Sequence, residues 1–153
     1  MTLPHELGKA YLEMIQDIKP NAIVGLATFA GCQLSDHAML DRLTHFDACV
    51  ARRALGHNWA SKPDSDRIQG VFVLEHARSG THPHWHGLVR LPEEHLLRYR
   101  QLMINAWRQY NYSSWVNINP QDVEKYTSGA SYILKEVQDI STDRIVFLNM
   151  LRG

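Results

Sequence analysis

The residues of this chain with the clearest chemical potential are four of its nine histidines, which lie between positions 76 and 86 in the stretch VLEHARSGTHPHWHGLV. Two of them, His84 and His86, flank Trp85. In a β-strand, residues i and i+2 point to the same face, so these two imidazoles would project side by side while the tryptophan faces the other way. Two imidazoles on one face can bind a divalent metal ion.

The surrounding sequence predicts a β-hairpin that would supply a third ligand. The runs RIQGVFVLEH and HWHGLVRL are strand-like, and the segment ARSGTHP between them contains Ser79 and Gly80, which suit a two-residue turn. That turn would set Glu75 directly opposite His84 and diagonal to His86. Side chains can bridge both separations around one ion. We therefore predict a metal site formed by Glu75, His84 and His86.

The length of the turn decides which side chains join this site. A longer loop with a bulge at Gly80 would shift the strand register and bring His76 or His82 toward the site instead. Pro83 has no N–H and limits pairing beside it. The alternative to a metal site is a set of solvated hairpin histidines. The histidines to which we assign no role, at the surface or at helix ends, are His37, His45, His57 and His95.

The ligand set predicts the type of metal chemistry. Two imidazoles and one carboxylate leave coordination positions open, as a catalytic site requires, whereas a structural site takes four protein ligands. Substrate or water would complete the shell. An oxygen-rich substrate such as a phosphodiester would favour Mg²⁺ or Mn²⁺, although imidazoles also accept Zn²⁺, Ni²⁺ or Co²⁺. The residues alone do not identify the metal.

A tyrosine near the end of the chain could supply a nucleophile. In DVEKYTSGASYILKEV the helical wheel places Tyr126 on the apolar stripe, so Tyr126 is expected in the core. Tyr132 lies on the opposite side, with Lys135 one helical turn away. A surface tyrosine beside a solubilising lysine is the alternative. Next to a bound metal, however, a phenol can attack a phosphodiester once the phosphate charge is neutralised.

The remaining patterns predict the elements that must position these residues. In order, they are a helix over 4–19, a strand over 22–30, a helix over 35–56, a loop over 56–67, the two hairpin strands, a helix from Pro92, a strand over 113–119, a helix from Pro120 to about Val137 and a strand over 144–148. Without the first helix, this is the split βαβ order. We predict an α+β fold on a ferredoxin-like, RRM-like antiparallel sheet. It would be a single domain over 1–153, with a helical extension over 1–20, a core over 21–153 and a C-terminal helix that carries the tyrosine.

Composition limits the remaining functional classes. The chain has 153 residues, and its sixteen basic and sixteen acidic side chains cancel, so no overall positive field indicates nucleic acid. Cys32 and Cys49 lack metal-type spacing, and the N-terminus lacks the pattern of a signal peptide. No apolar run is long enough to span a bilayer. We therefore expect a cytoplasmic protein with reduced thiols and no membrane partner.

The motifs together resemble those of the HUH endonucleases, named for histidine-hydrophobe-histidine, and particularly the rolling-circle replication initiators of plasmids and single-stranded DNA viruses. The pair is HWH at 84–86, the upstream acid is Glu75 in VLEH, and the downstream Tyr-x-x-Lys is YILK, with Tyr132 and Lys135. VGLATF loosely matches the family's first strand motif. The nuclease domains of this family have a ferredoxin-like sheet, so the resemblance covers nearly all of the chain from about residue 22.

The resemblance implies a metal-dependent single-stranded DNA endonuclease. Tyr132 would attack one phosphodiester in a specific sequence or hairpin origin, form a 5′-phosphotyrosine and release a 3′-OH, and the reverse reaction would join strands. The ion held by Glu75, His84 and His86, with Mg²⁺ or Mn²⁺ preferred, would polarise the phosphate while Lys135 helps to place it. No Gly-Lys-Ser/Thr phosphate-binding loop of a helicase is present, so a host helicase or polymerase is an expected partner.

Two alternatives stay open. A single-tyrosine transposase of a small insertion sequence shares the histidine pair, but its extra ligand is typically Gln or Asn on the tyrosine helix, where this chain offers only Gln138. A non-catalytic RRM-like nucleic-acid-binding module would need exposed strand aromatics, which VFVLEH lacks. Side chains that could contact DNA phosphates or bases are Arg52, Arg53, Lys62, Arg67, Arg78, Trp59 and Trp115.

Overall fold

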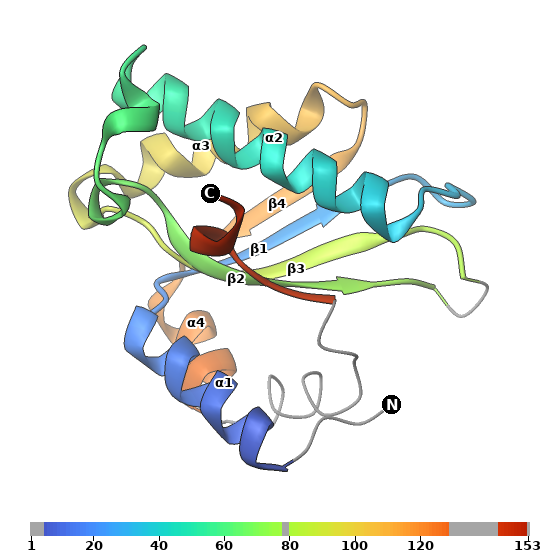
Figure 1. The fold of residues 1–153 in the computed structure, drawn as a ribbon, viewed down its shortest axis with the longest axis horizontal. Coiled ribbons are helices and arrows are strands. Elements are labelled where there is room, and N and C mark those ends of the chain that lie inside the picture. Colours follow the sequence, from blue (N-terminus) through green and yellow to red (C-terminus); the bar gives the residue numbers. More distant parts are fainter. Residues whose placement is uncertain (1–4, 78–79, 129–143, 153) are drawn as a thin grey trace.

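The fold is α+β, as predicted, and is built on one antiparallel sheet (Figure 1). The computed structural model describes residues 5–77, 80–128 and 144–152. The five strands lie in the order β4-β1-β3-β2-β5. They are β1 (Ala22–Ala27), β2 (Gln69–Glu75), β3 (His84–Arg90), β4 (Ser113–Asn117) and β5 (Ile145–Phe147). The first four strands have the split βαβ order expected from the sequence, and β5 extends the sheet beside β2.

Helices cover both faces of this sheet. In the described segments they are α1 (His5–Ile18), α2 (Asp36–Leu55), α3 (Leu96–Arg108) and α4 (Pro120–Ser128). Figure 1 shows α2 and α3 on one face and α1 and α4 on the other. Among the described residues, none of the helices combines the length and apolar composition that crossing a bilayer requires.

The alternation of side chains along the hairpin strands assigns each face its core. Phe72 and Leu74 of β2 and Trp85 and Val89 of β3 point toward α2 and α3 and are buried in the main apolar cluster. A smaller cluster on the opposite face joins strand residues to α1 and α4. Its buried members are Ile15, Ile23, Val71, Leu88, Val123, Ile145 and Phe147. The leading helix is therefore packed on the sheet through Ile15.

Helix boundaries follow local capping chemistry. The side chain of Ser35 accepts a hydrogen bond from the Ala38 N–H (3.1 Å), which starts α2 where the sequence predicts. Gly56 ends α2 with φ 87°. The helix expected from Pro92 instead begins with a 3₁₀ turn, Glu93–His95, and α3 starts only at Leu96. The cause is the extended ψ of 124° at Pro92, which lies outside the helical region.

The hairpin has the predicted register, although its turn differs from the prediction. β2 and β3 pair with Glu75 opposite His84. The loop, however, closes with the Ala77 N–H donating to the Thr81 carbonyl (2.8 Å), not through a two-residue turn at Ser79 and Gly80. One extra residue therefore lies on the β3 side of the loop. His82 lies there with a left-handed φ of 55°, and its N–H donates to the Cys32 carbonyl (2.9 Å). This local distortion absorbs the extra residue and preserves the strand register.

The last helix begins at Pro120, as predicted, and is described as far as Ser128. Its first turn is capped by the Asn119 side chain, which accepts hydrogen bonds from the N–H groups of Gln121 (2.9 Å) and Asp122 (3.3 Å). The predicted continuation to about Val137, which carries Tyr132 and Lys135, lies outside the described residues.

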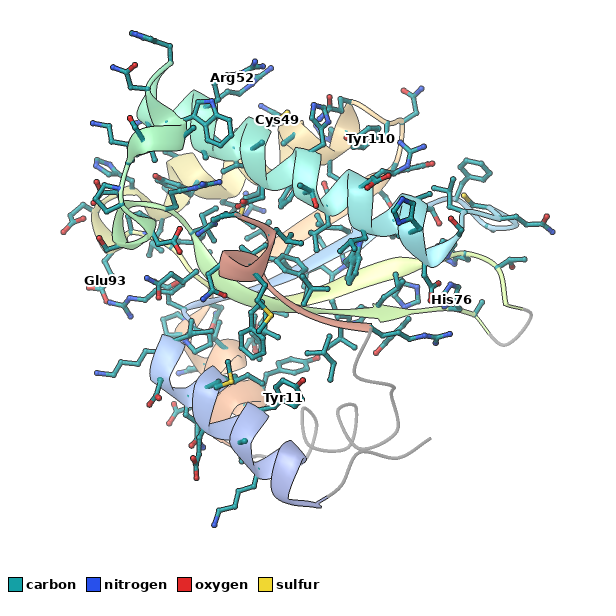
Figure 2. All side chains as sticks on the ribbon, in the orientation of Figure 1. Tyr11, Cys49, Arg52, His76, Glu93 and Tyr110 are labelled. Carbon is teal, nitrogen blue, oxygen red and sulfur yellow. The ribbon has the colours of Figure 1, made fainter. Side chains whose placement is uncertain are left out.

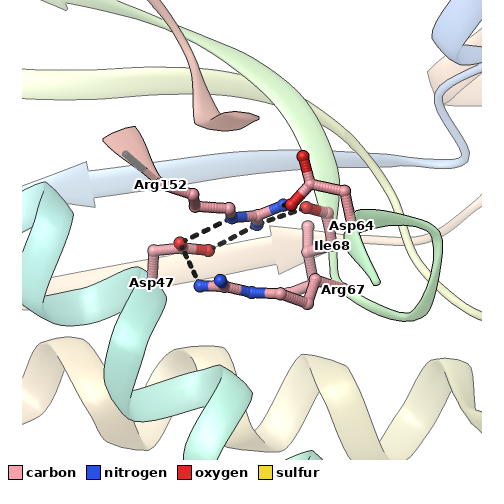
Figure 3. A network of polar contacts seen from close by, with 5 residues as sticks. All are labelled: Asp47, Asp64, Arg67, Ile68 and Arg152. Atoms are coloured by element: carbon pink, nitrogen blue, oxygen red, sulfur yellow. Dashed lines mark hydrogen bonds and ion pairs between the residues drawn. The ribbon is translucent and has the colours of Figure 1, made fainter. Parts of the chain in front are cut away.

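A buried ionic network fixes the C-terminal segment against α2 (Figure 3). Asp47 of α2 accepts hydrogen bonds from Arg67 Nη2 (2.9 Å) and from Arg152 Nε and Nη2 (3.0 and 2.8 Å). Arg152 also contacts Asp64 and the carbonyl of Ile68. At Arg152, burial lowers the pKa, but the hydrogen bonds and the attraction to Asp47 outweigh it, so the pKa is raised. At Arg67, burial outweighs the attraction to Asp47, so the pKa is lowered.

Candidate metal centre

The sheet face covered by α1 and α4 changes from apolar to polar along the strands. Residues paired across neighbouring strands point to the same face, so they form rows across the sheet. The apolar row contains Ile23, Leu88, Val71 and Phe147. The middle row contains Trp115, Gly25, His86, Val73 and Ile145. The end row contains Ser113, Ala27, His84 and Glu75. The predicted ligands occupy the last two rows, and the middle row also contributes Val73 and Ile145 to the apolar cluster under the helices.

The structure brings the three predicted metal ligands together. The ligand atoms of Glu75, His84 and His86 all lie within 4.8 Å of one another. Glu75 Oε2 is 3.1 Å from His84 Nε2 and 3.7 Å from His86 Nε2. The exposed fractions of the side chains are 22% for Glu75 and His84 and 36% for His86, so the cluster is open to solvent on one side. It is the only group of three or more potential metal ligands found in the part of the chain that the structure describes.

The hairpin loop orients one of these ligands. The Nδ1 of His84 lies 3.0 Å from the carbonyl oxygen of His82, so Nδ1 carries the proton and donates it. In the neutral ring protonated at Nδ1, the lone pair that can bind a metal is on Nε2, which lies 3.1 Å from Glu75 Oε2. A second hydrogen bond of this kind is common for histidines that bind metals, because it fixes both the tautomer and the ring orientation. The donor set and its support therefore fit a divalent ion.

The surroundings of His86 favour its neutral form. Burial lowers the pKa of His86, attraction to Glu75 opposes this, and His84 adds to the lowering. The neutral imidazole is the form that binds a metal. The His86 ring also makes an edge-to-face contact with Trp115, with ring centroids 6.4 Å apart.

An apolar cavity of about 90 Å³ lies directly beside the cluster. Its walls include Glu75 and His86 on the sheet, Trp115 on β4 and Tyr126 on α4. Tyr126 was expected in the core. It does pack against the smaller apolar cluster, but it is only partly buried and also lines this cavity. The wheel identified its apolar side correctly and could not show that the metal ligands lie next to it.

The other two hairpin histidines have different surroundings. His76 Nε2 lies 3.1 Å from Asp36 Oδ1 at the start of α2, and Asp36 also pairs with Arg144 (3.5 Å). His76 thus connects β2 to α2 and to the residue before β5. The His82 ring is tilted by 52° against the His84 ring, with ring centroids 5.6 Å apart, but His82 is not part of the ligand cluster. The register alternative that would have brought either residue into the site is therefore not realised.

The predicted DNA-contacting side chains are not grouped around this cluster. His76, next to Glu75, bonds to Asp36 at the first turn of α2, whereas Arg52 and Arg53 lie in its last turn. Arg52 lies sixteen positions after Asp36 in the helix, which corresponds to about 24 Å. Figure 2 shows Arg52 and His76 near opposite ends of α2.

The remaining DNA-contact predictions have separate outcomes. Lys62 lines a different cavity, with Trp59 and Arg67. Arg78 lies outside the described residues. Of the predicted contacts that the structure describes, only Trp115 adjoins the candidate metal ligands.

No protein-family model matches this chain, and neither a curated protein nor a solved structure shows significant similarity to it.

Proposed function

We propose that this protein is a metal-dependent, single-tyrosine endonuclease of the HUH type that nicks and rejoins single-stranded DNA to initiate rolling-circle replication. The observation that carries the proposal is the cluster of Glu75, His84 and His86 on one face of a ferredoxin-like sheet, with coordination positions left for substrate. A His₂-carboxylate set with a solvent-open side fits catalysis better than a closed structural site.

The role of the protein's own residues follows from this set. Glu75 and the two histidines hold a divalent ion, and His82 keeps the His84 ring in the binding tautomer through its carbonyl. The ion, Mg²⁺ or Mn²⁺, supplies charge neutralisation and polarisation of the scissile phosphate when bound. An oxygen-rich phosphodiester substrate suits these ions.

We assign the covalent step to Tyr132. Its phenol oxygen attacks the phosphorus, the Tyr–O–P bond forms and the P–O3′ bond breaks. The phenol proton leaves the tyrosine, and the departing 3′ oxygen gains a proton to become a 3′-OH. Lys135, three residues further along the sequence, offsets the negative charge that develops on the phosphate. The products are a 5′-phosphotyrosine and a 3′ end that can reverse the reaction or prime synthesis by a host polymerase.

The non-catalytic RRM-like alternative is less well supported. An RRM presents exposed aromatic side chains from its central strands on the open sheet face. Here the two corresponding strands, β1 and β3, carry no Phe, Tyr or Trp on that face, and α1 and α4 pack over part of it. The paired residues that they present there are Ile23, Gly25, Ala27, His84, His86 and Leu88. No specific observation favours the transposase over the initiator, because its distinguishing ligand position, Gln138, lies outside the described residues.

The test is formation of a covalent protein–DNA adduct. The full chain is incubated with labelled single-stranded oligonucleotides and Mn²⁺, and the products are separated on a denaturing gel. We expect a slow-migrating adduct that chelator abolishes. His84→Ala and His86→Ala should lose the adduct, whereas His37→Ala, an exposed residue on α2, should retain it.

Tyr132→Phe should also lose the adduct. If Tyr126→Phe abolishes the adduct and Tyr132→Phe retains it, the nucleophile is misassigned. If no oligonucleotide, including hairpin substrates, yields an adduct with the wild-type chain, the proposed activity is wrong.

A further inference from the structure

Trp115 is an exposed aromatic side chain at the edge of the metal centre. It lies on β4, the strand at one edge of the sheet, and 47% of its surface is accessible to solvent. By contrast, Trp85 and Trp107 are fully buried in the main core. A tryptophan left half-exposed on a sheet face, beside potential metal ligands, presents a large apolar surface to whatever occupies the site.

Gly25 allows the indole to lie where it does. Gly25 pairs with Trp115 on one side and with His86 on the other, so all three positions share one face. A Cβ added at Gly25 would lie 2.3 Å from indole atoms of Trp115. Because real Cβ atoms do not approach so closely, any side chain at position 25 would push the indole away. The missing side chain thus brings the aromatic ring toward the metal ligands.

The indole and the metal ligands form one continuous surface. The rings of Trp115 and His86 meet edge to face, at 85°. Both side chains also line the apolar cavity that extends to Tyr126 on α4. The candidate metal centre therefore adjoins a flat aromatic surface and an apolar cavity.

We propose that Trp115 is a stacking platform for a nucleobase of single-stranded DNA, positioned by Gly25 beside the phosphate-binding metal centre. This assignment rests on the proposed function, and it names a substrate contact at the same site. A nucleotide joins a charged phosphate to a flat apolar base, which matches the metal ligands and the indole in chemical character. Every base has a π-face, so the platform provides affinity with little sequence preference.

The platform makes a quantitative prediction. Removing one base–aromatic stack typically weakens binding by about 5-fold to about 150-fold, as obtained from measured alanine substitutions. The Trp115→Leu variant should therefore bind a single-stranded oligonucleotide with an affinity lower than that of the wild type by a factor in this range. Trp115→Phe, which keeps an aromatic face, should recover most of the loss.

The experiment measures fluorescence anisotropy of a labelled single-stranded DNA oligonucleotide with the full chain, in chelator, so that no cleavage occurs. Gly25→Ala should weaken binding because the indole is displaced, and the double variant should bind no more weakly than Trp115→Leu alone. Leu97→Ala, which shortens an exposed apolar side chain on α3, should bind like the wild type. Urea unfolding of each variant confirms that it is folded.

Two results would overturn the platform. One is wild-type affinity in a folded Trp115→Leu variant. The other is independent, additive losses in Gly25→Ala and Trp115→Leu, which would mean that Gly25 does not act through the indole. A third result would overturn DNA as the ligand: an RNA oligonucleotide of the same sequence binds more tightly than the DNA, and Trp115→Leu weakens that binding.

The outcome is separable from that of the proposed endonuclease activity. If the wild type forms no covalent adduct but Trp115→Leu still weakens binding, the endonuclease proposal fails and the platform stands. If the adduct forms and Trp115→Leu binds normally, only the platform fails.

Discussion

Replacing Asp47 by asparagine should strongly destabilise the fold, because this carboxylate is the shared acceptor of two buried guanidinium groups (Figure 3). The exposed fractions of the side chains are 5% for Asp47, 7% for Arg67 and 6% for Arg152. Arginine stays protonated in proteins, so the substitution would leave two buried positive charges without their counter-ion.

The size of the effect can be worked out from these contacts. Removing one partner of a buried ion pair costs about 3–5 kcal/mol. Arg152 would retain its contacts to Asp64 and to the Ile68 carbonyl, so we expect the lower end, about 3 kcal/mol. For a chain of this length, that corresponds to a fall in Tm of about 6–12 °C.

The assay is urea unfolding followed by circular dichroism, with Asp41→Asn as the matched control. Asp41 pairs with His37 one turn away on the same helix, but both side chains are largely exposed, so its loss should cost less than about 1 kcal/mol. If Asp47→Asn and Asp41→Asn lose equal stability, the network does not hold the C-terminal segment as argued.

Three further predictions concern the site, the core and a buried phenol. Glu75→Gln should weaken Mn²⁺ binding by at least about tenfold, which is the loss in metal affinity seen even when a group that only orients a ligand is replaced. The affinity is measured from the paramagnetic resonance of free Mn²⁺, with the exposed Glu93→Gln as the control. Equal affinity in the two variants would exclude the Glu75 carboxylate as a ligand. Gly87→Ala should cost about 1–3 kcal/mol in urea unfolding, because the new Cβ would lie 2.4 Å from the fully buried Phe72 ring, and an unchanged midpoint would contradict this. Burial raises the pKa of Tyr99, so the folded chain keeps this phenol protonated to higher pH than the unfolded chain. The free energy of unfolding should be unchanged below about pH 10 and should fall as the pH rises above it. In Tyr99→Phe this fall should be less steep, and identical pH profiles for the variant and the wild type would contradict the assignment.

The fold class and most elements were predictable because their signals are local. Apolar spacing located α2 and the hairpin strands, and Ser35, Pro120 and Gly56 are found where helices begin or end. The start of α3 was less predictable, since proline permits both helical and extended ψ.

The clustering of Glu75, His84 and His86 was predictable because strand alternation and pairing constrain three residues at once. The correct pairing of Glu75 with His84 nevertheless came from a turn that does not form as predicted. The burial of Trp85 on one face and the alternation of the strands preserve the register, and the bond from the His82 N–H to Cys32 accommodates the extra loop residue.

The residue types available for chemistry, their alternation along two strands and the order of the elements can be read from the sequence, since these depend on near neighbours. Which distant side chains share the site depends on the folded chain. The place of Tyr126 beside the ligands and the approach of Trp115 over Gly25 each join segments that are distant in the sequence. Strand pairing and helix docking set these contacts, because they bring together side chains that the residue spacing within one element does not relate.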